Sequence, residues 1–313
     1  MNIVRLDDFR PSNNVEDRRD QGSGGGGFRL PIGGGGIGIG GIAIVLLISY
    51  VTGINPLTLF GVYESVTGGG GQVSAPGPSP QTQQAQQGGQ QGTPNDQVGD
   101  TVARVLRSTE ETWTEIFQQQ GVGKAYRAPT LVLFRGQTRS GCGTADAAMG
   151  PFYCPNDQKV YLDTAFFEQM RRRFNACPPA EGACAFSQAY VVAHEIGHHV
   201  QNMLGILPKV HKAEQRARSE AEANAYSVRL ELQADCLAGV WGAHSGQKLH
   251  LEQADVAAAL QTANAIGDDA LQRATRGQVV PDSFTHGSSE QRQRWFTTGL
   301  RSGQISACNT FQR

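Results

Sequence analysis

His194-Glu195-Ile196-Gly197-His198 is the stretch that decides the fold, because in a helix its two histidines lie four residues apart on one face. That spacing suits the bite of a zinc ion. Glu195 then projects near the metal without being a ligand, and there it can take a proton from a zinc-bound water and pass it to a leaving amine. The alternative is a buried helix whose histidines bond to backbone groups.

The residues around this stretch predict a helix. Ser187 is a candidate N-cap, residues 190–193 supply an apolar face, and Gly205 is a natural stop. H-E-x-x-H within a helix is the pattern of a metalloprotease site. The longer motif with a third histidine is excluded, because its last positions are occupied by Gln201 and Leu204.

A zinc ion needs a third protein ligand and an open fourth position, and Glu231 on a second helix can supply that ligand. Residues 219–222 match a capping box that would begin this helix. An apolar stripe at helical spacing follows, made of Leu230, Ala234, Leu237 and Trp241. Asp235 lies one turn after Glu231, where it would accept the ring N–H of a ligating histidine. The alternative is two solvated helix carboxylates.

These motifs resemble those of the bacterial predicted neutral zinc metallopeptidases and, more distantly, those of the gluzincin metallopeptidases. The residues that carry the resemblance are 193–201, 231–239, 149–155 and 285–287 together with Arg292. The resemblance implies a zinc-dependent peptidase fold over roughly residues 98–310. It also places His286 and Arg292 over the zinc, where they would stabilise the oxyanion of the tetrahedral intermediate. The alternative is a loop histidine and a surface arginine.

The composition changes along the chain and predicts four regions. The 313 residues carry a net charge of −1, which speaks against nucleic acid as a partner, and most of the 40 glycines and half of the 14 prolines precede residue 100. Residues 1–31 predict a disordered cytoplasmic tail, and the uncharged residues 32–57 a transmembrane helix. Residues 58–97, rich in Gly, Gln and Pro, predict a flexible linker, and residues 98–313 form the expected zinc metallopeptidase domain.

Arginines precede the hydrophobic segment and none follows it before Arg104, so the positive-inside rule predicts a single-pass membrane protein with a periplasmic or extracellular catalytic domain. Cysteine usage agrees with an oxidising compartment, because all 6 cysteines follow the segment. Six cysteines allow about 15 pairings. We favour Cys142–Cys154 and Cys177–Cys184, which close short loops, and Cys236–Cys308.

The periodicity predicts an α+β fold, a mainly helical zincin-like domain with a small sheet, preceded by one transmembrane helix. Helices are expected at 102–117, 164–174, 251–273 and 291–300, besides the two zinc helices, and strands at 129–134, 149–153 and 158–163. A strand at the rim of the sheet could hydrogen-bond an extended peptide beside the metal. The other histidines, His199, His211, His244 and His250, are expected on solvated helix faces.

These features together predict a membrane-anchored zinc peptidase acting outside the cytoplasm. Its Zn2+ would be bound by His194, His198 and Glu231, with Glu195 as the base. The expected partners are a peptide or protein substrate and the membrane. The alternative is a non-proteolytic, zinc-stabilised extracytoplasmic binding or scaffold domain, which would have no use for Glu195 and would close its site with a fourth ligand. The sequence leaves open the substrate, endo- or exopeptidase action and the oligomeric state.

Overall fold

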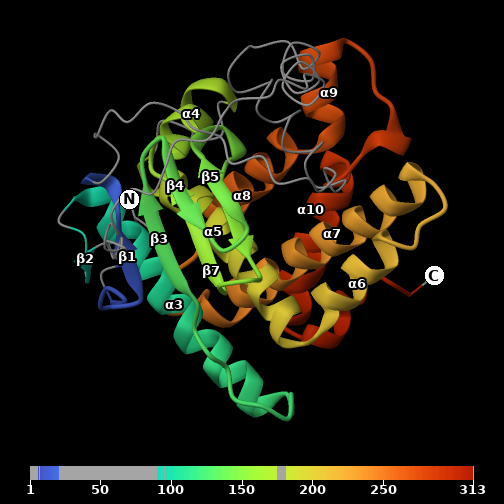
Figure 1. Ribbon diagram of the computed structural model, residues 1–313. Coiled ribbons are helices and arrows are strands. Elements are labelled where there is room, and N and C mark those ends of the chain that lie inside the picture. The colour runs from blue at the N-terminus through green and yellow to red at the C-terminus, as the bar shows by residue number, and fades with distance from the viewer. Residues whose placement is uncertain are drawn as a thin grey trace, which may run out of the picture.

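The structure of the chain is a computed structural model, and it describes residues 6, 8–20, 90–92, 94, 96–174 and 181–312. Two small sheets and a group of helices make up this part (Figure 1). The strands are β1 (Val15–Asp17), β2 (Gln90–Gln91), β3 (Thr130–Phe134), β4 (Gln137–Ser140), β5 (Gly143–Asp146), β6 (Phe152–Cys154) and β7 (Lys159–Asp163). The helices are α3 (Gln97–Gln119), α4 (Ala165–Phe174), α5 (Glu181–Met203), α6 (Ile206–Glu214), α7 (Glu220–Ser245), α8 (Gln253–Ala265), α9 (Asp268–Arg276) and α10 (Ser289–Ser302). Short 3-10 turns lie at Ala147–Met149, Pro281–Ser283 and Ile305–Cys308. The mainly helical α+β class predicted from the sequence is confirmed.

The main sheet has the strand order β2-β1-β3-β7-β6 and is covered on both faces. Strand β3 runs parallel to β1 and β7, and β6 closes one edge antiparallel to β7. Alternate side chains of β3 point to opposite faces: Leu131 and Leu133 join the core formed with the helices, whereas Val132 and Phe134 join a second, smaller cluster. Ala145 of the β4–β5 hairpin belongs to that smaller cluster.

Close helix crossings bring the metal-ligand residues together. At Gly197, inside the H-E-x-x-H stretch, an added Cβ would meet the carbonyl oxygen of Ala234 at 2.9 Å, so α7 can approach α5 this closely only where a side chain is missing. Helices α7 and α10 lie side by side (Figure 1) and cross at Gly299, where a Cβ would meet the oxygen of Cys236 at 1.8 Å. The small residues between the motif residues therefore set the distance between the helices that carry them.

The N-terminal residues differ from the expected disordered tail, because residues 8–20 are part of the domain. Val15 is buried within β1, which pairs with β3 through Val15↔Leu131. Ser12 Oγ and Asn14 Nδ2 both donate to Glu110 Oε1 of α3, at 2.6 Å and 2.7 Å. A strand of three residues is too short to show periodicity, and its partners lie about a hundred positions along the chain, so composition alone did not reveal it.

The membrane topology predicted from the sequence is corrected. Residues 32–57 lie outside the described residues, and within the described part no helix is both long and apolar enough to cross a bilayer. Strand β1 and helix α3 flank that segment in the chain and belong to one domain, because β1 pairs with β3 and Ser12, three residues before β1, donates to Glu110 of α3. They therefore lie on the same side of any membrane, which contradicts a cytoplasmic N-terminus joined to a catalytic domain outside.

The elements themselves agree with the sequence in part. Ser219 is the N-cap of α7, as predicted, and its side chain accepts a hydrogen bond from the Glu222 amide. Ser187 is not a cap, because α5 begins at Glu181. The helix expected at 251–273 is two helices, α8 and α9, broken at Gly267, where a Cβ would meet the Ser289 amide nitrogen at 2.4 Å. Helix α6 and the β4–β5 hairpin were not predicted.

Two of the three predicted disulfides are confirmed. Cys142 is bonded to Cys154, which joins the β4–β5 hairpin to β6, and Cys236 of α7 is bonded to Cys308. The third predicted pair, Cys177–Cys184, lies outside the residues whose side chains the structure describes.

Candidate metal centre

His194 and His198 on α5 face Glu231 on α7. His194 Nε2 lies 3.1 Å from Glu231 Oε2, and His198 Nε2 lies 3.5 Å from Glu231 Oε1. One ligand atom from each residue lies within 4.8 Å of the others. A tetrahedral zinc ion with bonds of about 2.0–2.2 Å holds neighbouring ligand atoms about 3.2–3.6 Å apart. The three residues therefore fit a zinc ion.

The charges at these ligands also favour a cation. Burial by itself would lower the pKa of His194, but the carboxylates of Asp235 and Glu231 outweigh it and raise that pKa to about 10. Burial would likewise raise the pKa of Glu231, yet His198 and His194 hold it well below its usual range. Each carboxylate thus prefers its ionised form beside a positive charge, and a metal ion supplies that charge when it displaces the histidine protons.

The ring nitrogen of His194 that faces away from Glu231 meets a buried ionic network. His194 Nδ1 lies 2.8 Å from Asp235 Oδ1, where the sequence predicted a carboxylate acceptor. Arg292 donates to both Asp235 oxygens from Nε and Nη2, each at 2.9 Å, and Tyr190 Oη donates to Oδ1 at 2.5 Å. Burial would raise the pKa of Asp235, but Arg292 and His194 outweigh it and lower that pKa to about 2. The ionised Asp235 fixes the His194 ring with Nε2 toward the metal position.

The corresponding nitrogen of His198 meets a neutral side chain. His198 Nδ1 lies 2.9 Å from Gln201 Oε1, and Gln201 in turn contacts Gln233 and the carbonyl of Leu230. Sequence reasoning used Gln201 only to exclude a longer motif. Its position one turn after His198, on the same helix face, was the signal that could have identified it.

Glu195 has the surroundings of a general base. Its side chain is buried in the wall of the same cavity as the ligand residues. Burial raises the pKa of Glu195, and the neighbouring His194 and His198 oppose that shift only in part. A carboxylate with a raised pKa is a better proton acceptor near neutral pH than an exposed one.

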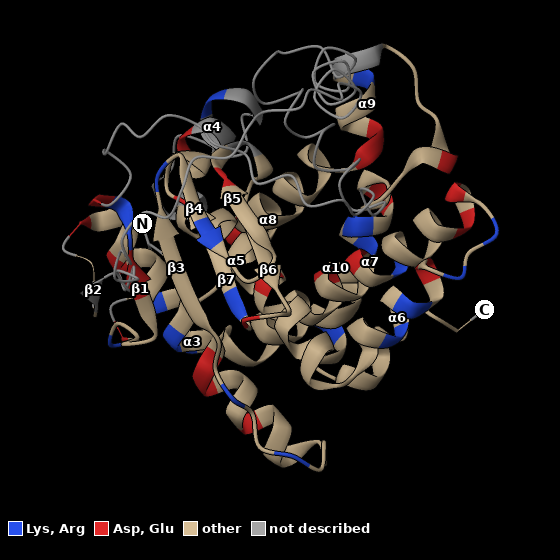
Figure 2. Ribbon diagram, in the orientation of Figure 1, with Lys and Arg blue, Asp and Glu red and all other residues tan. Residues whose placement is uncertain are grey.

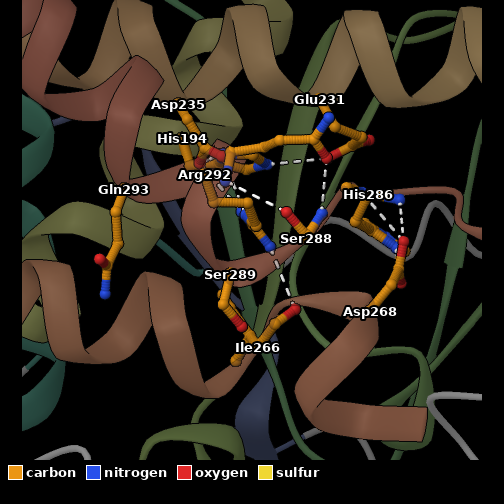
Figure 3. Close-up of polar contacts among 12 residues, drawn as sticks. His194, Glu231, Asp235, Ile266, Asp268, His286, Ser288, Ser289, Arg292 and Gln293 are labelled. Atoms are coloured by element: carbon orange, nitrogen blue, oxygen red, sulfur yellow. Dashed lines mark hydrogen bonds and ion pairs between the residues drawn. The ribbon is translucent and has the colours of Figure 1, made fainter. Parts of the chain in front are cut away.

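His286 lies in the loop between the turn at Pro281–Ser283 and α10, and it faces the same cavity. Asp268, at the first position of α9, shapes that loop: its Oδ2 accepts the backbone N–H groups of Thr285, His286 and Gly287 at 2.7, 2.6 and 2.9 Å. Asp268 Oδ1 lies 3.4 Å from His286 Nδ1. Figure 3 shows these two side chains next to each other. Burial would lower the pKa of His286, but Asp268 and Glu231 outweigh it and raise that pKa. Asp268 was not singled out in the sequence.

Arg292 lines the same cavity as the metal-ligand residues. Its side chain is only 3% exposed, which excludes the surface arginine. The guanidinium is bonded to Asp235 and Tyr190, and Nη1 reaches the carbonyl of Ile266 at 3.4 Å (Figure 3). Arg292 therefore holds Asp235, and the contact with the oxyanion that the resemblance implied stays a prediction.

A cavity of about 300 Å³ opens beside these residues. Away from the polar groups its walls are mainly apolar, formed by Met149, Phe152, Phe166, Leu207, Leu230 and Leu271. His211 of α6 also lines it. Edge strand β6 lies along this cavity, because Phe152 and Tyr153 are among its lining residues.

The expectation of a solvated face is wrong for His199, whose side chain is 1% exposed. Its Nε2 lies 2.6 Å from the carbonyl oxygen of Arg127 and its Nδ1 lies 3.1 Å from Tyr153 Oη. Burial lowers the pKa of His199 to about 4. His199 is therefore a neutral structural residue next to a ligand in the sequence.

Two histidines and a glutamate on adjacent helices, with a buried carboxylate between the histidines, define a centre of the zinc metallopeptidase class. Residues 4–311 match the model of the family described as "Putative neutral zinc metallopeptidase", and the chain belongs to that family. It is 45% identical over 313 residues to "Uncharacterized protein YpfJ" of Escherichia coli K12, which covers 98% of this chain and 99% of that protein. It is also 41% identical over 196 residues to "Uncharacterized protein Rv2575" of Mycobacterium tuberculosis H37Rv, over 59% of this chain and 63% of that protein. No solved structure matches the chain.

Proposed function

We propose that the protein is a zinc-dependent peptidase that hydrolyses peptide bonds in a peptide or protein substrate. The observation that carries the proposal is Glu195, a buried carboxylate placed between two metal-ligand histidines in the wall of an open cavity. A structural zinc site is closed by four protein ligands. Within the described residues, the group that could hold a metal here has three, His194, His198 and Glu231. The fourth position is left for a reactant, which favours the peptidase over a zinc-stabilised binding or scaffold domain.

The residues have distinct roles in this reaction. A Zn2+ ion held by the three ligands would act as a Lewis acid on the scissile carbonyl and on a water molecule. Glu195 accepts the proton of the attacking water and later donates it to the leaving amine, for which its raised pKa is suited. His286 lines the cavity and its Nδ1 lies near Asp268, so Nε2 is left to donate to the developing oxyanion, and its raised pKa favours the imidazolium that this role needs.

The edge strand suggests how a substrate is held. Among the strands that the structure describes, β6 pairs only with β7, and Phe152 and Tyr153 of β6 line the cavity. An extended peptide could therefore add to that edge through backbone hydrogen bonds, which would give binding with little side-chain selectivity. Figure 2 shows Lys and Arg interspersed with Asp and Glu over the described elements, in keeping with a peptide rather than nucleic acid as the substrate.

The test is cleavage of a peptide library by the purified full chain, with zinc, with a chelator, and with zinc restored. Glu195→Gln is the matched variant, because it keeps the size of the side chain and removes the base. We expect cleavage to require zinc and to fall by on the order of 10²–10⁴ in Glu195→Gln while zinc stays bound. Cleavage that is equal in Glu195→Gln would disprove the mechanism. A zinc-loaded chain that cleaves nothing would favour the binding or scaffold alternative.

A further inference from the structure

A chain of neutral hydrogen bonds runs from His198 to the C-terminal end of the fold. His198 Nδ1 lies 2.9 Å from Gln201 Oε1. Gln201 Nε2 donates to Leu230 O at 2.7 Å and to Gln233 Oε1 at 3.1 Å. Gln233 Nε2 donates to Cys308 O at 2.8 Å. The chain therefore ends on backbone carbonyls at both Leu230 and Cys308.

These two carbonyls determine the direction of every bond in the chain. A carbonyl can only accept, so the NH2 groups of Gln201 and Gln233 must face Leu230 O and Cys308 O. The oxygen of Gln201 then faces the imidazole, and His198 must carry its proton on Nδ1. In that tautomer Nε2 has a free lone pair, and it is Nε2 that faces Glu231 and the metal position.

Burial leaves these groups without substitute partners. Gln201 is 0% exposed and Gln233 is 6% exposed, so water cannot replace a lost contact. Leaving a buried amide unpaired costs about 1–3 kcal/mol. The alternative ring orientation, with Nδ1 unprotonated against Gln201 Oε1, would place two acceptors against each other. The amide chain thus selects one ring state of His198.

The Cys236–Cys308 disulfide holds the far end of the chain. It bonds the short turn that carries Cys308 to α7, and α7 also carries Gln233 and Glu231. Cys236 and Cys308 are both buried. The acceptor at Cys308 O is therefore covalently tied to the helix that supplies the third metal ligand.

We propose that Gln201 and Gln233 are positioning residues for the metal ligand His198, and that the Cys236–Cys308 disulfide maintains their orientation. This deepens the function proposed above, since it rests on the same zinc site. It does not depend on peptide cleavage, because zinc affinity can be measured without a substrate.

The test measures the zinc affinity of the full chain by competition with a chromophoric chelator of known affinity. Gln201→Leu removes the acceptor of His198, and we expect zinc to bind 10–100-fold more weakly. Gln233→Leu acts one bond further away and should show a smaller loss in the same direction. Gln272→Leu is the matched control: Gln272 is buried to a similar extent and bonded to Ser283 and Val280, away from the metal. It should lose stability and keep the wild-type zinc affinity.

A second pair of variants tests the disulfide. Replacing Cys236 and Cys308 together by Ala should weaken zinc binding, whereas the same change at Cys142 and Cys154, which joins only the hairpin to β6, should not. The tautomer of His198 is an independent readout, because nitrogen NMR shifts of zinc-free protein distinguish Nδ1–H from Nε2–H at a pH high enough for the ring to be neutral. We expect Nδ1–H in the wild type and a mixture in Gln201→Leu.

The outcomes separate this inference from the function proposed above. An unchanged zinc affinity and tautomer in both Gln201→Leu and Gln233→Leu would overturn the positioning role, even if the wild type cleaves peptides. A wild type that binds zinc and responds to these variants but cleaves nothing would support the positioning role and refute the peptidase. A wild type that binds no zinc would overturn both.

Discussion

The two histidines of one helix are supported in opposite ways. His194 Nδ1 is hydrogen-bonded to an ionised carboxylate, Asp235, which is itself bonded to Arg292. His198 Nδ1 is hydrogen-bonded to the uncharged amide of Gln201. The balance of buried charges explains why one histidine has a charged partner and the other a neutral one. Three carboxylates face one guanidinium at this centre, so a divalent cation makes the group neutral. The carboxylates are those of Glu195, Glu231 and Asp235.

A carboxylate at the position of Gln201 would add a further buried negative charge. It would raise the cost of burying the group and weaken the pull of the metal on a bound carbonyl. The Asp235 carboxylate therefore both orients His194 and raises its basicity as a ligand, whereas the Gln201 amide orients His198 without adding charge. The comparison predicts that replacing Asp235, the partner of His194, lowers the free energy of unfolding more than replacing Gln201, the partner of His198.

Removal of the ligands themselves should have the largest effect and should not distinguish the two sides. His194→Ala, His198→Ala and Glu231→Ala each remove one metal bond, so all three should lose stoichiometric zinc and, with it, cleavage. Metal analysis of the purified variants is the measurement, with Glu195→Gln as the control that keeps its zinc. One zinc per chain in all three variants would show that the site is elsewhere.

Breaking the ionic side should destabilise the metal-free protein more than breaking the neutral side. Asp235→Leu leaves the buried Arg292 unpaired, and we expect the free energy of unfolding to fall by about 3–5 kcal/mol. Gln201→Leu should cost about 1–3 kcal/mol. The double variant Asp235→Leu/Arg292→Met should recover much of the first loss, because no charge is left unpaired. Denaturant unfolding in the presence of a chelator measures all three.

An exposed ion pair gives the reference for this prediction. Arg107 and Glu111 lie one turn apart on α3 with exposed side chains, and Glu111→Gln should cost only about 0–1 kcal/mol. Equal losses in Asp235→Leu and Gln201→Leu would mean that the two supports differ in charge but not in energy.

His286 should affect the chemistry while leaving both supports intact. If its Nε2 donates to the oxyanion, the bond strengthens as the carbonyl becomes tetrahedral. His286→Ala should then lower kcat by on the order of 10²–10³ with a much smaller change in KM. Zinc content should stay at one per chain. Loss of zinc would instead make His286 a ligand, and unchanged kinetics on a cleavable peptide would make it a loop histidine without a role.

The sequence predicted His194, Glu195 and His198 from their short spacing, and Glu231 and Asp235 from the pattern of a second helix. It assigned no role to Gln201, Gln233 or Asp268. His194, His198 and Glu195 share one helix, and their spacing alone places them beside one cavity. The bonds of Arg292 to Asp235 and Ile266 were not predicted, because they depend on how α7, α10 and the end of α8 pack. Nothing in the local pattern shows that packing.

The same limit applies to the fold. The long amphipathic helix at 102–117 and the strand at 129–134 were recognisable because their apolar residues repeat with a regular period. Strand β1 was not, because its pairing with β3 spans more than a hundred residues and its neighbours are charged. That omission also produced the wrong membrane topology, since β1 shows that residues 15–17 belong to the domain that carries the candidate metal centre.

The stability of the fold should depend on pH through His199, which is not among the candidate metal ligands. Its pKa is about 4 in the folded protein, against about 6.5 in an unfolded chain, so the unfolded chain takes up a proton first as the pH falls. The neutral His199 ring adds its full contribution to the free energy of unfolding above pH ~6.5, and about 3 kcal/mol of that stability is lost by pH ~4.

His194 changes stability in the opposite direction in metal-free protein. Its pKa of about 10 means that the charged ring stabilises the fold fully below pH ~6.5, and that this stability is lost as the pH rises toward 10. The free energy of unfolding should be measured from pH 4 to 10. In His199→Gln it should no longer fall between pH ~6.5 and ~4, and in His194→Gln it should no longer fall between pH ~6.5 and ~10. If His199→Gln left the fall between pH ~6.5 and ~4 unchanged, the ring would not be neutral in the fold, and its contacts with Tyr153 and Arg127 would have to be reassigned.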